Sequence, residues 1–152
     1  MTRHRRAFSL VELVLIVVIL AVMTFIAVPK MQFATLRQQK ADAAARKIAT
    51  DLKLARRLAI CNAATNVSGY AMRMTGASPY SSYDIVNLAT SEVVDSYSID
   101  SEVSCTGGTS FEFGPLGNLL VGSDTQLTVS SEGRSFTVTV VSATGAVKCI
   151  DN

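Results

Sequence analysis

The chain has 152 residues, of which 49% are hydrophobic and 17% are charged, and its formal net charge is +2. This length allows one compact domain and one anchor but not two full cores. The single histidine, His4, lies near the start of the chain, so histidine-based acid–base or metal chemistry is excluded from the rest of the chain.

The N-terminal end combines a basic leader with an apolar segment. Residues 1–7 contain three arginines and no acid. From Phe8 to Val28 the chain has 21 residues, which as a helix are about 30 Å long, the thickness of a bilayer core. Basic residues beside an apolar run favour the cytoplasmic side of a membrane. The sequence therefore predicts a single-pass transmembrane helix over 8–28, with its N-terminus in the cytoplasm.

Glu12 is a carboxylate inside this apolar segment. A charged side chain within a membrane costs a few kcal/mol and generally has a partner. One alternative is that Glu12 lies at the membrane surface and reaches water. Another is a secretory signal peptide, but the apolar core of such a signal is about 7–15 residues long, shorter than the apolar run of this chain.

Residues 5–13, Arg-Arg-Ala-Phe-Ser-Leu-Val-Glu-Leu, resemble the class III signal of type IV pilins and pseudopilins. The resemblance implies that a prepilin peptidase cleaves between Ala7 and Phe8 and N-methylates Phe8. It also implies that Glu12 pairs with the N-terminal amine of a neighbouring subunit during assembly. Ala7 stands where the family usually has glycine. Pro29 matches a proline that many pilins carry and predicts a helix kink.

After Pro29 the sequence is rich in helix formers and contains no glycine or proline before Gly69. It predicts an amphipathic helix over 29–67. The apolar face follows spacings of three or four residues and consists mainly of small side chains. Its members are Ala41, Ala44 or Ala45, Ile48, Leu52, Ala55 and Ala59.

Residues 68–152 alternate between apolar and polar side chains and contain many turn residues, which predicts a β-rich head outside the membrane. Strands after a long helix indicate an α+β fold in which one antiparallel sheet packs against the helix. The expected strands are 70–74, 83–88, 93–99, 110–113, 126–130, 135–142 and 146–150.

The last third of the chain carries a second resemblance, over residues 111–148. Its Phe-Glu-Phe, Gly-Pro-Leu-Gly, Phe-Thr-Val-Thr-Val and Thr-Gly-Ala-Val-Lys segments are similar to the head of the H-type minor pseudopilins (GspH/FimT-like). The resemblance implies a structural subunit that waits in the bacterial inner membrane, in contact with lipid and the assembly platform. It then joins other pseudopilins in a periplasmic pseudopilus of a type II secretion system. The alternatives are a minor pilin of a type IV pilus or DNA-uptake system, and a monomeric membrane-anchored binding domain.

Charge is divided unevenly along the chain. Without the three leader arginines, eleven basic residues face twelve acids. Residues 30–73 contain nine Lys or Arg against two acids, whereas residues 74–152 contain two against nine. The basic helix is either a solvated face or a surface for acidic parts of neighbouring subunits, with Arg56 and Arg57 as candidates. Nucleic acid is a disfavoured partner, because the tail 148–152 contains no arginine.

Three cysteines fall in the part expected outside the membrane, where disulfides form. We expect Cys105 and Cys149 to be paired, with Cys61–Cys105 and Cys61–Cys149 as alternatives. No phosphate loop or nucleophile elbow is present, and no cofactor or metal site is expected. The chain is therefore not expected to be an enzyme. Asp95, Asp100 and Glu102 leave open a calcium-binding acidic loop.

Overall fold

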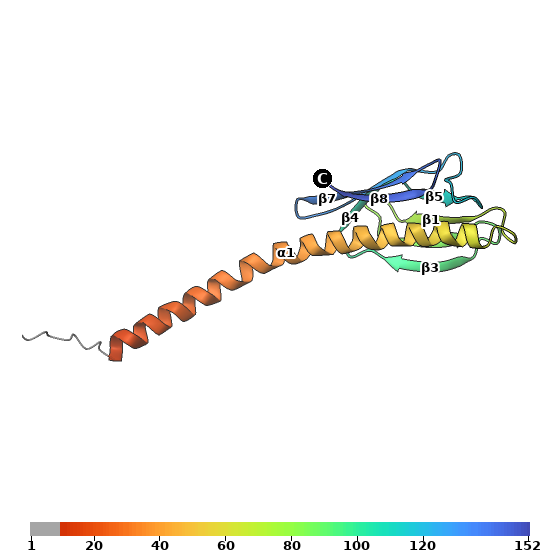
Figure 1. Cartoon of the computed structure of the whole chain (residues 1–152). Coiled ribbons are helices and arrows are strands. Elements are labelled where there is room, and N and C mark those ends of the chain that lie inside the picture. The colour runs from red at the N-terminus through yellow and green to blue at the C-terminus, as the bar shows by residue number, and fades with distance from the viewer. Residues whose placement is uncertain (1–9) are drawn as a thin grey trace, which may run out of the picture. The chain divides into compact units, whose positions relative to one another are not determined.

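The computed structural model describes residues 10–152, except for the side chains of residues 26–34. Its described part contains one helix followed by eight strands (Figure 1). Two compact units divide the chain, one ending at Leu36 and the other comprising Arg37–Asn152, which we call the head unit. The elements are α1 (Leu10–Cys61), β1 (Tyr70–Thr75), β2 (Ser82–Asn87), β3 (Val93–Ser98), β4 (Ser104–Gly107), β5 (Ser110–Phe113), β6 (Gln126–Ser131), β7 (Arg134–Val141) and β8 (Ala146–Asp151).

Helix α1 forms because most of its residues are good helix formers and none is glycine. The predicted apolar stripe in its second half is confirmed, since all of its members are buried in the core of the head unit. Small side chains predominate in this stripe, which allows strands to approach the helix closely. The helix ends at Cys61, before the expected boundary at residue 67. A turn follows, in which the backbone N–H of Asn66 donates to the backbone carbonyl O of Asn62 at 2.7 Å.

The predicted membrane-spanning half of the helix is contradicted. In the described residues, no helix has both the length and the apolar character needed to cross a membrane.

The predicted single sheet is also wrong, because the head unit contains two four-stranded antiparallel sheets. The first has the strand order β3-β2-β1-β5 and the second the order β4-β6-β7-β8. Strand β4 was not predicted, and it pairs with β6 while the next strand, β5, pairs with β1. The chain therefore changes sheets over Gly108 and Thr109, the two residues between β4 and β5. Alternating polarity predicts strands, but it does not specify which strands pair.

Each sheet has two edge strands, and the fold covers one edge of each. The Tyr80 amide N donates to the Cys105 carbonyl O at 2.8 Å, and its hydroxyl donates to the Gly107 carbonyl O at 2.7 Å, which covers β4. The segment 119–124 covers β5, where the Leu120 amide N donates to the Glu112 carbonyl O at 2.8 Å. Strands β3 and β8 have no second neighbouring strand in the described part of the chain.

Candidate assembly surfaces

The residues predicted for processing lie at the start of the chain. Ala7 and Phe8 are outside the described residues, so cleavage and N-methylation stay predictions. The side chain of Pro29 is also outside them. The helix continues through this position, and the kink stays a prediction.

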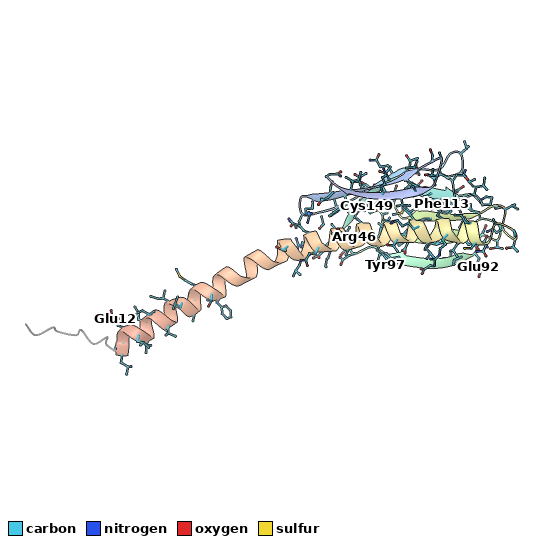
Figure 2. All side chains as sticks on the ribbon, in the orientation of Figure 1. Glu12, Arg46, Glu92, Tyr97, Phe113 and Cys149 are labelled. Atoms are coloured by element: carbon cyan, nitrogen blue, oxygen red, sulfur yellow. The ribbon has the colours of Figure 1, made fainter. Side chains whose placement is uncertain are left out.

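Glu12 lies in the first turn of α1, where the partial positive charge of the helix end favours a carboxylate. Figure 2 labels it on a helix whose other side chains in this region are almost all apolar. Leu15 and Ile16, one turn further along, are 58% and 46% exposed. No ion pair joins Glu12 to a basic side chain of the described residues. The carboxylate thus lies within an apolar surface and lacks a cation from its own described chain.

The other polar side chain of this segment, Thr24, is satisfied within the helix. Its hydroxyl donates to the carbonyl oxygens of Leu20 at 3.0 Å and Ala21 at 2.9 Å. Because these bonds to the preceding turn occupy the hydroxyl, Thr24 needs no partner outside the helix. Glu12 is therefore the one polar group of residues 10–25 that needs a partner from elsewhere.

In the head unit, α1 is fixed to the first sheet by a buried polar cluster. The Tyr83 hydroxyl donates to Asp51 Oδ2 at 2.7 Å, and Lys47 Nζ donates to both Asp51 carboxylate oxygens at 2.7 Å. Lys47 Nζ also lies 5.2 Å from the centre of the Tyr97 ring. Burial, and then the hydrogen bond to Asp51, raises the pKa of Tyr83 far above its ordinary value. The tyrosine therefore stays protonated and acts as a donor to the carboxylate.

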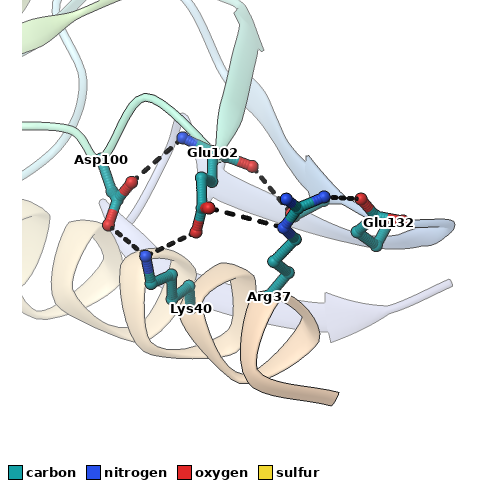
Figure 3. A network of polar contacts seen from close by, with 6 residues as sticks. Arg37, Lys40, Asp100, Glu102 and Glu132 are labelled. Carbon is teal, nitrogen blue, oxygen red and sulfur yellow. Dashed lines mark hydrogen bonds and ion pairs between the residues drawn. The ribbon is translucent and has the colours of Figure 1, made fainter. Parts of the chain in front are cut away.

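A network of exposed ion pairs joins the first turns of the head unit's helix to two loops (Figure 3). Lys40 Nζ lies 2.9 Å from Asp100 Oδ2 and 2.5 Å from Glu102 Oε2. Arg37 pairs with Glu102 and with Glu132. The backbone N–H of Glu102, followed by Lys40, lowers the pKa of Asp100. All five side chains are partly exposed, so salt screens the network.

This network bears on the possible calcium loop. Asp100 and Glu102 face Lys40, and a cation is already their partner. Among the described residues, no group of three or more potential metal ligands gathers. The acidic residues are thus engaged in holding the helix.

The predicted Cys105–Cys149 disulfide is contradicted by the strand order. All three cysteines are free thiols, Cys105 buried and the other two exposed. Cys105 lies in β4 and Cys149 in β8, with β6 and β7 between them. Three strand spacings amount to about 14 Å, whereas disulfide-bonded Cα atoms are at most about 7 Å apart. Burial raises the pKa of the Cys105 thiol to about 12, which keeps it protonated and unreactive.

Cys149 faces a groove between β8 and α1. The groove has a volume of about 440 Å³ and is lined by Asp42, Arg46, Arg134, Phe136, Cys149 and Asp151. Arg46 Nε lies 2.8 Å from Asp42 Oδ1. Figure 2 labels Arg46 on α1 and Cys149 among the neighbouring strands. Cys61 lies about four helical turns beyond Arg46, about 22 Å away, which also contradicts a Cys61–Cys149 pair.

Fewer basic side chains of α1 are free at its surface than the sequence implied. Arg56 is half-buried, and its Nε donates to the Gly117 carbonyl O at 3.1 Å, so it holds a loop. Arg57 is exposed and has no ion pair among the described residues. The exposed positions of this half recur every three or four residues, as one stripe of the helix. We call it the exposed stripe, and its members are Ala43, Arg46, Thr50, Lys53, Arg57 and Ile60.

Sequence reasoning missed Asp51 and Tyr83. The Lys47–Asp51 spacing of four residues predicts a helix pair, but the third member lies in a strand 32 residues further along.

Comparison of this chain with family models, with curated proteins and with solved structures gives no match.

Proposed function

We propose that this chain is a minor pseudopilin, a structural subunit of a type II secretion pseudopilus. A prepilin peptidase cleaves it before Phe8, and it assembles with other pseudopilins, through an inner-membrane platform, into a periplasmic filament that drives protein export. The second candidate is a minor pilin of a type IV pilus or DNA-uptake system. Neighbouring genes separate the two: a secretion ATPase with an outer-membrane secretin indicates the first, and twitching or competence genes indicate the second.

The observation that carries the proposal is the apolar surface of α1. Every large apolar side chain from Leu10 to Leu20 is at least 46% exposed. These side chains point in all directions around the helix, and a helix that is apolar all round is buried in its working state. Neighbouring helices of a filament core provide such burial on every side. Full burial contributes on the order of 10 kcal/mol per helix before the entropic cost of association.

Glu12 gives this surface its specificity. A carboxylate buried among apolar helices is strongly unfavourable unless a cation pairs with it. In the pilin family that cation is the N-terminal amine of a neighbouring subunit, which here belongs to Phe8. Removing the charge while keeping the shape of the side chain therefore tests assembly without disturbing the head unit.

The first experiment measures the intact mass and N-terminal sequence of the chain extracted from cells of its natural host. A chain that begins at N-methylated Phe8 supports the proposal. An uncleaved chain that keeps Met1, or a cut after Ala27, overturns it.

The second experiment measures, by chemical cross-linking in the same cells, how much of the chain joins other pseudopilins. Glu12→Gln is expected to lower this fraction by at least about tenfold, because breaking a buried ion pair costs several kcal/mol. Asp84→Asn, which removes one negative charge from the head unit, is the matched control and should leave it unchanged. An unmodified chain that stays monomeric beside other pseudopilins indicates the anchored binding domain instead and refutes the filament.

A further inference from the structure

The end of the head unit at which α1 stops is formed by four loops that contain no charged side chain. They are residues 62–69, 87–91, 114–123 and 142–145. Of the three loops at the opposite end of the head unit, two contain the acids of the ion-pair network in Figure 3. We call the four loops without charge the uncharged end. This composition is unusual for a surface in water, where charged side chains are normally interspersed.

Direct contacts join these four loops to one another. The Leu119 amide N donates to the Ser142 carbonyl O at 2.9 Å, and the Leu88 amide N donates to the Gly69 carbonyl O at 3.1 Å. Gly69 in turn lies so close to the start of the loop 114–123 that a β-carbon on it would lie 1.9 Å from the Phe113 carbonyl O. The loops therefore form one connected surface.

The amide side chains of the uncharged end are turned inward. Its four asparagines all form hydrogen bonds within the head unit. Asn66 Nδ2 donates to the Gly69 carbonyl O at 2.9 Å and to Asn87 Oδ1 at 2.7 Å. Asn62 and Asn118 donate to backbone carbonyl oxygens at 3.0 Å and 3.1 Å. These side chains therefore need no hydrogen-bond partner from outside the head unit.

Large apolar side chains of the same loops are turned outward. Val67 is 79% exposed, Leu116 is 87% exposed and Val121 is fully exposed. Single apolar side chains at a surface are ordinary, but these three project from connected loops that carry no charge. Grouped apolar side chains of this kind mark a contact with a membrane or with another protein.

We propose that the uncharged end is a lipid-contacting surface, which inserts Val67, Leu116 and Val121 beneath the headgroups of a phospholipid bilayer. A surface in contact with acyl chains must satisfy its polar groups internally, because the acyl chains form no hydrogen bonds. The asparagines of the uncharged end meet this requirement. The surface is distinct from the apolar surface of α1 that carries the proposed function.

A protein partner fits this end less well than lipid does. Protein interfaces form about one hydrogen bond per 100–200 Å² and are anchored mainly by aromatic and arginine side chains. At this end the asparagines already have partners, and Phe113 is fully buried. Arg56 is half-buried and holds the Gly117 carbonyl O. The exposed large side chains of these loops are aliphatic, which is the chemistry of the acyl chains themselves.

Charged side chains next to the uncharged end do not select a lipid headgroup. Arg57, one turn before the end of α1, and Glu92, after the loop 87–91, are both exposed and form no ion pair among the described residues. Figure 2 labels Glu92 close to this end of the head unit. Because the two charges have opposite signs, the apolar side chains supply the attraction, and salt has little effect on it. Three aliphatic side chains contain less hydrocarbon than a myristoyl chain, whose membrane binding is marginal and reversible. The contact therefore leaves the chain free to join a filament.

The test uses the two exposed native thiols of the full chain, since Cys105 is buried. Cys61 ends α1 at the uncharged end, whereas Cys149 lines the groove beside Arg46, about four helical turns back along α1. Cys149→Ser and Cys61→Ser each leave one exposed thiol, to which an environment-sensitive fluorophore is attached. The labelled chain is diluted from detergent into phosphatidylcholine vesicles with brominated acyl chains, which quench a fluorophore that reaches them. We expect quenching at Cys61 and none at Cys149. Any vesicle binding by α1 itself is common to both chains.

Leu116→Asp tests the insertion directly, because it places a charge where the proposal needs an apolar side chain. It should raise the lipid concentration for half-maximal quenching at Cys61 by at least about tenfold. Ile150→Asp is the matched control, because Ile150 is an aliphatic side chain of β8 that is 53% exposed, and it should leave this concentration unchanged. Val67→Asp repeats the test in a second loop. All three side chains are at least half exposed, so the head unit should stay folded, and its tyrosine fluorescence measures this.

Equal quenching at the two thiols overturns the inference, as do equal effects of Leu116→Asp and Ile150→Asp. Binding that requires phosphatidylglycerol and disappears at high salt also overturns it, because headgroup charge then supplies the attraction. A photo-cross-linking residue at position 116 should form lipid adducts in cells, and a discrete protein adduct in their place assigns this end to a protein partner and overturns the inference. The Glu12→Gln experiment is independent, because a chain without lipid contact at this end can still assemble through α1.

Discussion

Replacing Tyr83 with phenylalanine removes one hydroxyl from the interior of the head unit and changes nothing else in the side chain's shape. Tyr83 is 1% exposed, and its hydroxyl donates to Asp51 at 2.7 Å. The Asp51 carboxylate is itself 5% exposed, so water does not readily replace the lost donor. Lys47 remains as a partner of the carboxylate. The substitution therefore isolates one buried hydrogen bond to a charged acceptor.

A hydrogen bond to a charged group contributes about 1.5–3 kcal/mol to stability. We expect Tyr83→Phe to lower the free energy of unfolding by about 2 kcal/mol, or the Tm by about 8 °C for a unit of about 100 residues. Folding raises the pKa of Tyr83. Its contribution is therefore complete below the ordinary value of 10.0 and is lost as pH rises beyond it. The variant should lose part of the alkaline decline in stability.

Urea unfolding followed by tyrosine fluorescence measures this effect in the full chain. The chain has no tryptophan and four tyrosines, all between residues 70 and 97, so the signal reports the head unit alone. Tyr97→Phe is the matched control, because its ring contacts Tyr83 at 5.3 Å but none of the hydrogen bonds described above uses its hydroxyl. If the two variants lower stability equally, within about 0.5 kcal/mol, the assignment of the stabilisation to the Tyr83–Asp51 bond is refuted.

Three further predictions concern contacts of the head unit and use the same unfolding measurement. Gly145→Ala should lower the free energy of unfolding by about 3 kcal/mol or more, because its β-carbon would lie 1.8 Å from the Gly117 carbonyl O at a φ of 64°. Gly133→Ala, at a φ of 80° in open space, is the control and should lower it by about 1 kcal/mol. Equal losses of stability in the two variants would contradict the packing argument. Glu102→Gln should lower the Tm in dilute buffer but not at about 1 M salt, where screening acts within about 3 Å; a loss that persists in salt would contradict an ion-pair role. The backbone N–H groups that bind Asp124 lower its pKa. The stabilisation by Asp124 is therefore complete above the ordinary pKa of 3.8 and is lost as pH falls through the lowered pKa. Asp124→Asn should flatten this decline of stability in acid, and an unchanged pH profile would contradict the assignment.

The apolar stripe of α1 and most strands could be predicted from the sequence because they depend on local periodicity. Residues three or four apart share one face of a helix wherever the chain goes, and alternate residues share one face of a strand. The stripe from Ala41 to Ala59 is buried for that reason. Likewise, the charge of Glu12 among apolar neighbours is a property of the sequence alone.

Strand partners and edges were decided only by the tertiary structure. Cys149 lies in a predicted strand and Cys105 in β4, which was not predicted. Strands β6 and β7 lie between them in the sheet. Tyr83 meets Asp51 across 32 positions of sequence, and β3 and β8 are open because other segments cover β4 and β5. These outcomes depend on long-range register, which many alternating sequences satisfy equally well until the strands pack together on the helix.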